Sequence, residues 1–124
     1  FLAAVGSLAQ IKARMDFSAG FFQVAGFDVI SNNAFENADS ALDQALASNA
    51  KVIVLCASDD DYPALVPDFM NKLKTKSNDK IIVLAGYPKD YIETFSNEGI
   101  SFFIHMKSDI IQTLSDIMKK IGVL

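Results

Sequence analysis

Three consecutive carboxylates are the residues whose types and spacing best suit chemistry. Asp59, Asp60 and Asp61 follow a run of apolar residues that ends near residue 56. Carboxylates in this position could bind a divalent cation, or one of them could accept a phosphoryl group, a role that Lys107 would support. Residues 5–8 contain no acidic side chain that would complete a magnesium site. We therefore interpret the three carboxylates as solvent-exposed groups at the start of a helix.

Three single residues could carry other chemistry. The only histidine, His105, could act as a ligand or base, but no carboxylate or nucleophile is assignable beside it. Ser7 lacks the Gly-x-Ser-x-Gly turn of a nucleophile and is interpreted as a helix cap. The only cysteine, Cys56, lies within an apolar run, which favours a small buried hydrophobe. These patterns therefore assign no catalytic, cofactor-binding or metal-ligating residue.

The composition is that of one ordinary domain over residues 1–124, because 51% of the residues are hydrophobic and 21% are charged. The formal net charge is -4 without a cluster of Lys and Arg, so nothing favours binding to nucleic acid or to an anionic membrane. The apolar runs are far shorter than the ~20 residues of a membrane-spanning helix. The first residues resemble a strand entered midway, not a signal peptide. We expect a cytoplasmic domain excised from a longer chain.

Short apolar runs alternate with longer segments of helical spacing, which is the pattern of βα units. Runs that are apolar at consecutive positions suit strands covered on both faces, as in a parallel sheet. Right-handed crossovers then favour the strand order 2-1-3-4-5. We predict a flavodoxin-like (Rossmann-like), doubly wound α/β fold in three layers, α/β/α. Its five strands are expected at residues 1–5, 27–30, 52–56, 81–85 and 102–104.

Five helices are expected between these strands, at residues 8–25, 39–46, 59–73, 88–97 and 108–121. Asp39 or Ser40 is the expected N-cap of the second helix, and Pro67 predicts a kink or a delayed start in the third. Gly99 is the expected end of the fourth helix. The other expected boundaries are an N-cap at Ser108 and helix ends at Gly26 and Gly122. Asn32, Asn33 and Asn37 are expected to be turn residues.

Any ligand of such a sheet lies beyond the carboxyl ends of the strands. The corresponding loops are at residues 6–9, 31–38, 57–61, 86–89 and 105–108. The first loop has too few glycines for a dinucleotide-binding fingerprint or a P-loop, because both need backbone amides to approach phosphate closely. Nucleotide binding by either mode is therefore not expected.

Four motifs carry a resemblance to a known family: Ala-Gly-Phe-Asp-Val-Ile at residues 25–30, the apolar strand at 52–55, Leu-Val-Pro at 65–67 and Ile-Ile-Val-Leu-Ala-Gly at 81–86. Together they resemble the C-terminal cobalamin-binding-type domain of the methylmalonyl-CoA mutase family. The resemblance spans essentially the entire chain. Because these are mainly scaffold motifs, they identify the fold better than the function.

Cobalamin-binding members of this family have an Asp-x-His-x-x-Gly motif after the first strand, whose histidine ligates cobalt. The corresponding positions, counted back from Gly26, are Ala9, Ile11 and Arg14, so all three motif residues are absent. The family's Ser-x-Leu and Gly-Gly motifs correspond to residues 56–58 and 85–86 and are also altered. The resemblance therefore implies a degenerate domain without cofactor, as in the non-catalytic small subunit of the heterodimeric enzymes.

In that family the large subunit binds adenosylcobalamin and interconverts methylmalonyl-CoA and succinyl-CoA. We accordingly expect a heterodimer with a large catalytic subunit and no catalytic activity in this domain. Two alternatives stay open: a cobalamin-binding domain with another ligand, for which His105 is the next candidate, and a degenerate receiver-like signalling domain that uses the carboxylates at 59–61. We also expect Phe17, Phe21 or Phe35 to fill the vacated cofactor crevice.

Overall fold

A parallel β-sheet forms the centre of this computed structural model, which describes residues 1–6, 8–23, 29–30, 35, 37–76, 80–86, 88–105 and 110–120. In these residues four strands lie side by side in the order β1-β2-β3-β4. Their bounds are β1 (Leu2–Ala4), β2 (Val52–Cys56), β3 (Ile81–Ala85) and β4 (Phe102–Ile104). The helices are α1 (Leu8–Gln23), α2 (Ala38–Ala47), α3 (Tyr62–Lys76), the 3-10 turn η1 (Lys89–Tyr91), α4 (Ile92–Glu98) and α5 (Ile110–Lys120). The predicted α/β class with a parallel sheet is confirmed.

The described residues form four strands, not the five predicted in the order 2-1-3-4-5, and these four lie in the order that the prediction gives to strands 1, 3, 4 and 5. Of the expected strand at 27–30, residues 27 and 28 lie outside the described residues, and Val29 and Ile30 form no strand. Two described residues of this part of the chain bond to β1: Ile30 accepts from the Leu2 amide at 3.0 Å, and Phe35 forms an isolated bridge with Val5. Ile30 is also 40% exposed. The exposed Ile30 side chain has little of the packing that stabilises a strand.

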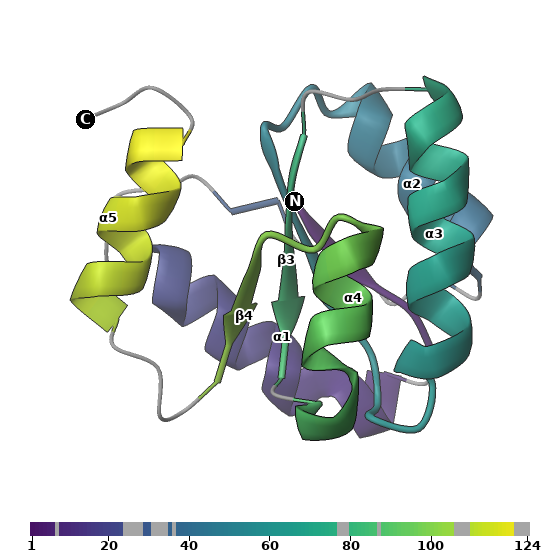
Figure 1. The fold of residues 1–124 in the computed structure, drawn as a ribbon, viewed down its shortest axis with the longest axis horizontal. Coiled ribbons are helices and arrows are strands. Elements are labelled where there is room, and N and C mark those ends of the chain that lie inside the picture. The colour runs from purple at the N-terminus through teal and green to yellow at the C-terminus, as the bar shows by residue number, and fades with distance from the viewer. Residues whose placement is uncertain are drawn as a thin grey trace.

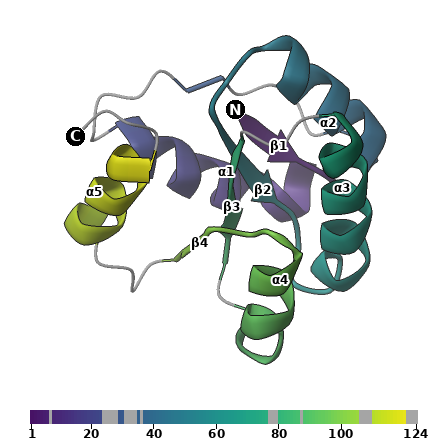
Figure 2. The same ribbon diagram turned by 45° about the horizontal axis from the view of Figure 1, so that its top comes forward.

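The helices cover the two faces of the sheet, which gives the predicted three layers (Figure 1). Helices α2, α3 and α4 pack on one face, and α1 and α5 pack on the other. Figure 2 shows the same separation after rotation, with α1 and α5 together and α2 beside α3. None of the described helices has the length and the apolar character that crossing a membrane requires.

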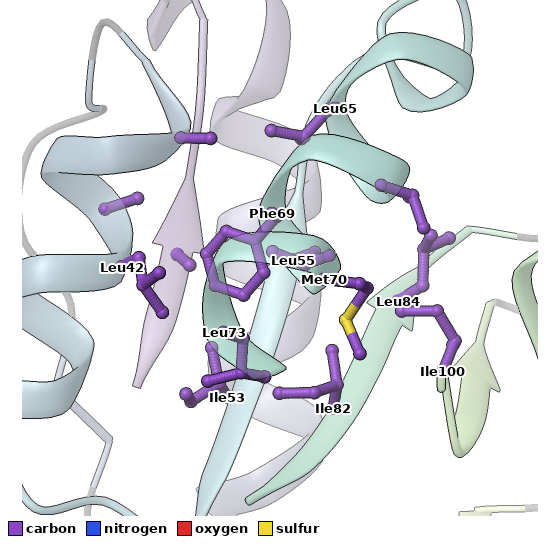
Figure 3. Close-up of a cluster of buried hydrophobic side chains, with 14 of the residues drawn as sticks. Leu42, Ile53, Leu55, Leu65, Phe69, Met70, Leu73, Ile82, Leu84 and Ile100 are labelled. Carbon is purple, nitrogen blue, oxygen red and sulfur yellow. The ribbon is translucent and has the colours of Figure 1, made fainter. Parts of the chain in front are cut away.

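Alternation along the buried strands divides the core between the two faces. All five residues of β2 and all five of β3 are buried, and alternate side chains of a strand point to opposite faces. Ile53 and Leu55 therefore meet α2 and α3, whereas Val54 meets α1. Figure 3 shows the first cluster, in which Phe69 of α3 lies between Leu42 of α2 and the sheet. Burial of a side chain such as Phe69 contributes about 1.5–3 kcal/mol.

The N-terminal ends of two helices differ from the sequence expectation. Asn37, not Asp39 or Ser40, caps α2: its side chain accepts from the Ser40 amide at 2.9 Å. Its extended backbone, with φ -150 and ψ 169, is the conformation that an N-cap needs. Helix α3 begins at Tyr62 and runs through Pro67, so the expected delayed start does not occur. The expected boundaries at Gly26, Ser108 and Gly122 lie outside the described residues.

Gly99 ends α4 as predicted, in a left-handed conformation with φ +116. Its amide donates to Ser96 O at 3.1 Å, and a Cβ added there would come within 2.7 Å of the Met70 methyl of α3. The position thus needs glycine for its backbone conformation, whereas the Met70 methyl is the end of a flexible side chain and can shift.

We expect Gly99→Ala to lower the free energy of unfolding by about 1–3 kcal/mol, because alanine is strained in a backbone conformation with φ +116. Gly20→Ala is the matched control, since Gly20 lies inside α1 and a Cβ added there would meet nothing within 4 Å. This control is expected to raise stability by about 0.5–1 kcal/mol. Urea denaturation followed by circular dichroism measures both effects, and equal stability of the two variants would contradict this account of Gly99.

Candidate functional site

A cavity of about 290 Å³ lies at the carboxyl ends of β3 and β4, where they face α1. This is the edge of a parallel α/β sheet at which ligands bind. Apolar groups form most of its wall, and two side chains with nitrogen donors join them. The lining residues are Ala13, Arg14, Phe17, Ala85, Gly86, Ile104 and His105.

Arg14 connects α1 to the loop that follows β2. One terminal nitrogen donates to Ala57 O at 2.5 Å, and the other donates to Asp59 Oδ1 at 2.6 Å. The guanidinium carbon lies 5.6 Å from the centre of the Tyr62 ring, in cation-π contact. The guanidinium also lies over Gly86, where an added Cβ would be 3.5 Å from its central carbon. A single side chain therefore bridges three elements across the strand ends.

The surroundings of Arg14 favour its charged form. Burial lowers its pKa, but the hydrogen bond and charge of Asp59, together with Tyr62, outweigh burial and raise the pKa above its ordinary value. The Asp59 side chain is 68% exposed and that of Arg14 is 29% exposed. Water therefore screens the carboxylate more than the guanidinium. The ion pair orients the Arg14 side chain more than it stabilises the fold.

The Tyr62 hydroxyl joins the ends of β2 and β3 beneath Arg14. It donates to Ala85 O at 2.5 Å, lies 3.3 Å from Leu55 O and accepts from the Ala57 amide at 3.1 Å. Tyr62 is fully buried, and burial raises the pKa of its hydroxyl above the ordinary value. The phenol is therefore a neutral structural group that satisfies backbone groups where the sheet ends.

The positions that correspond to the cobalt-ligand motif lie inside helix α1. Ile11, at the histidine position, is 1% exposed and packs in the core against the sheet. Its side chain has no nitrogen donor. Arg14, at the position of the motif's glycine, fills space over Gly86. Ala9 is in the same helix, and its side chain is outside the described set. These residues do not fit a cobalt ligand.

The structure separates most of the other candidate residues. Asp59 pairs with Arg14, while Asp60 and Asp61 are exposed in the turn before α3. Within the described ranges, no group of three or more His, Cys, Asp or Glu side chains could hold a metal ion. His105 lies at the end of β4 and lines the cavity. Four candidates fall outside the described residues: Ser7, Lys107, Asn32 and Asn33.

The expected filling of the crevice by aromatic rings does not occur. Phe17 lines the cavity without filling it. Phe21 packs edge-on against Phe22 in the core, and Phe35 stacks on Phe1 on the opposite face of the sheet. Arg14 is the residue that crosses the strand ends instead.

The sequence analysis placed Arg14 at the position of the motif's glycine but did not predict its hydrogen-bond partners. The Arg14 contacts with Ala57 and Asp59 join residues more than forty positions apart, and no periodic pattern reports such a pair. Tyr62 was missed because it resembles any residue of the first helical turn. The available signal was the hydroxyl of Tyr62, which lies in the sequence between two apolar strands. Buried tyrosine hydroxyls usually find hydrogen-bond partners.

Removal of the Tyr62 hydroxyl is expected to destabilise the chain. Tyr62→Phe leaves the buried Ala57 amide without its acceptor and should lower the free energy of unfolding by about 1–3 kcal/mol. Tyr91→Phe is the matched control, because Tyr91 is 42% exposed and should change stability by less than about 0.5 kcal/mol. Chemical denaturation of both variants checks this, and a similar loss in both would contradict the proposed role.

Because of Cys56, the free energy of unfolding should vary with pH in the alkaline range. The residue is fully buried, and burial raises the pKa of its thiol to about 11 from 9.0. Above pH 9 the unfolded chain loses this proton while the folded chain keeps it, so the free energy of unfolding should fall by about 2 kcal/mol between pH 9 and 11. Cys56→Ala should show a correspondingly smaller fall in urea melts, and identical pH profiles would refute the assignment.

Comparison with known proteins gives a partial match. No family model matches the chain. The chain is 34% identical over 123 residues to the methylmalonyl-CoA mutase small subunit of Porphyromonas gingivalis (strain ATCC BAA-308 / W83). The aligned region is 99% of this chain and 19% of that protein, so the chain spans about a fifth of the relative's length. The resemblance inferred from the motifs is confirmed: nearly the whole chain is similar to a domain-sized part of a methylmalonyl-CoA mutase small subunit.

Proposed function

We propose that this chain is a non-catalytic, cobalamin-free domain of the small subunit of a heterodimeric methylmalonyl-CoA mutase. Its function is structural: it preserves an α/β scaffold within the small subunit and supports association with a large catalytic subunit. In the family that the chain resembles, the large subunit holds adenosylcobalamin and interconverts methylmalonyl-CoA and succinyl-CoA. A fold can persist in this way because packing and site residues are different positions.

The burial of Ile11 is the observation that carries this proposal. Ile11 corresponds to the cobalt-ligating histidine, yet it lies within α1 and is 1% exposed in the core. An isoleucine offers no lone pair to a metal, and its side chain is packed among the apolar residues of the core. The position has become part of the hydrophobic core.

Arg14 supports the same proposal. Its guanidinium lies over Gly86, which belongs to the pair of residues that corresponds to the family's Gly-Gly motif. A large cofactor needs open backbone at that place, whereas here a charged side chain bonds to Ala57 and Asp59 across it. Access for a corrin ring would require that these two bonds break.

One alternative keeps a specific observation in its favour. His105 borders the cavity at the end of β4 and carries the imidazole that Ile11 lacks. A cobalamin bound through His105 would therefore be an atypical member of the cofactor-binding class. No arrangement of the described residues similarly favours a receiver-like phosphorylation site.

Titration with hydroxocobalamin and adenosylcobalamin tests the proposal. We expect no saturable change in the cobalamin absorbance spectrum, and no calorimetric heat, up to about 100 μM cobalamin, a concentration at which even weak specific sites begin to fill. A cobalamin-binding mutase domain measured in parallel serves as the positive control. Saturable binding would overturn the proposal, and its loss in His105→Ala would establish the alternative.

The partner prediction needs a separate experiment on the longer subunit. Co-expression of the complete small subunit with a large mutase subunit should yield one complex in size-exclusion chromatography. Gly99→Ala in the small subunit should reduce the yield of the complex, since it weakens the scaffold, whereas Gly20→Ala should not. Elution of the two subunits as separate monomers would contradict the proposed association.

A further inference from the structure

The cavity between α1, β3 and β4 has the composition of a small-molecule site. Its wall combines the Phe17 side chain with the aliphatic side chains of Ala13, Ala85 and Ile104, and adds the nitrogen groups of Arg14 and His105. Ligand pockets are typically apolar with a few polar groups that fix orientation. The volume of about 290 Å³ is at the lower end for such pockets, so the ligand must be small.

Arg14 gives this cavity a preference for negative charge. The guanidinium has five N–H donors, and the bonds to Ala57 O and Asp59 use one on each terminal nitrogen. Both terminal nitrogens and the central carbon of the guanidinium lie within 3.6 Å of the position that a Gly86 Cβ would occupy, and Gly86 lines the cavity there. Arginine binds carboxylates in a forked geometry, and such charge-assisted bonds are about twice as strong as neutral ones.

We propose that this cavity binds a small organic carboxylate with an apolar body. The carboxylate pairs with Arg14 at the Gly86 end, and the apolar body lies against Phe17 and Ile104. Asp59 competes for the same guanidinium, but its side chain is 68% exposed, so water screens the charge of its carboxylate. The inference does not depend on the proposed mutase function, because it concerns only groups of this chain.

Benzoate and benzamide are suitable probes, because they share a shape and differ in charge. Titration of the ¹⁵N-labelled 124-residue chain with benzoate should give saturable amide shifts at Gly86 and His105, with a Kd on the order of 1 mM. Benzamide should bind at least about fivefold more weakly, because the amide cannot form the charged pair. Absence of saturation with benzoate up to about 20 mM would overturn the proposal.

Three variants test the geometry in opposite directions. Arg14→Gln should weaken benzoate at least about tenfold and leave benzamide within about twofold. Asp59→Asn should strengthen benzoate several-fold, because it removes the competing carboxylate. Ala13→Leu should abolish the binding of both ligands, because the larger side chain fills the cavity from an exposed helical position. Ala47→Leu on α2 is the matched control and should change the binding of neither ligand.

Circular dichroism of each variant confirms that the chain is folded before it is titrated. Equal affinities for benzoate and benzamide, or unchanged benzoate binding in Arg14→Gln, would refute the role of the charge. Unchanged binding in Ala13→Leu would refute the location. Failure of the mutase proposal gives a different result, namely saturable binding of cobalamin, so the two outcomes are distinguishable.

Discussion

Burial of the central strands on both faces is the constraint on which the rest of this structure depends. Every residue of β2 and of β3 is buried, so each strand supplies side chains to two separate cores at once. A helix on each side is then obligatory, because an uncovered face would leave a row of large aliphatic side chains in water. The positions of α1, α2 and α3, and hence the edge at which the cavity lies, follow from that requirement.

This constraint also explains which parts of the fold could be predicted from the sequence. The apolar runs at 52–56 and 81–85 coincide with β2 and β3, since no other element buries five consecutive residues so simply. The run at 27–30 was also expected to form a strand, although Asp28 interrupts it, but Ile30 is exposed and accepts a hydrogen bond from the Leu2 amide of β1. Local composition does not reveal whether a second layer covers a segment, so the additional strand was predicted wrongly.

Of the candidate site, the sequence predicted only that the family's cobalt-ligating histidine is absent. The resemblance to the mutase family places Ile11, counted back from Gly26, at the position of the family's histidine, and this difference is visible in the sequence. The bonds from Arg14 to Ala57 and Asp59, and the three backbone contacts of Tyr62, depend on how two loops meet in space. No periodic pattern or sequence motif predicts side-chain contacts between residues that are far apart in the chain. Such contacts are therefore seen only in the folded structure.

Under the proposed function, the place of Ile11 in the core would make the loss of a cofactor site difficult to reverse in evolution. A histidine at this position would put a polar ring into the apolar cluster that contains Met15 and Val54, and its burial without a partner would cost stability. Arg14 would still bridge α1 to the loop after β2. Recovery of binding would therefore need more than one substitution. The packing of a domain of the proposed kind would keep it in a scaffold role.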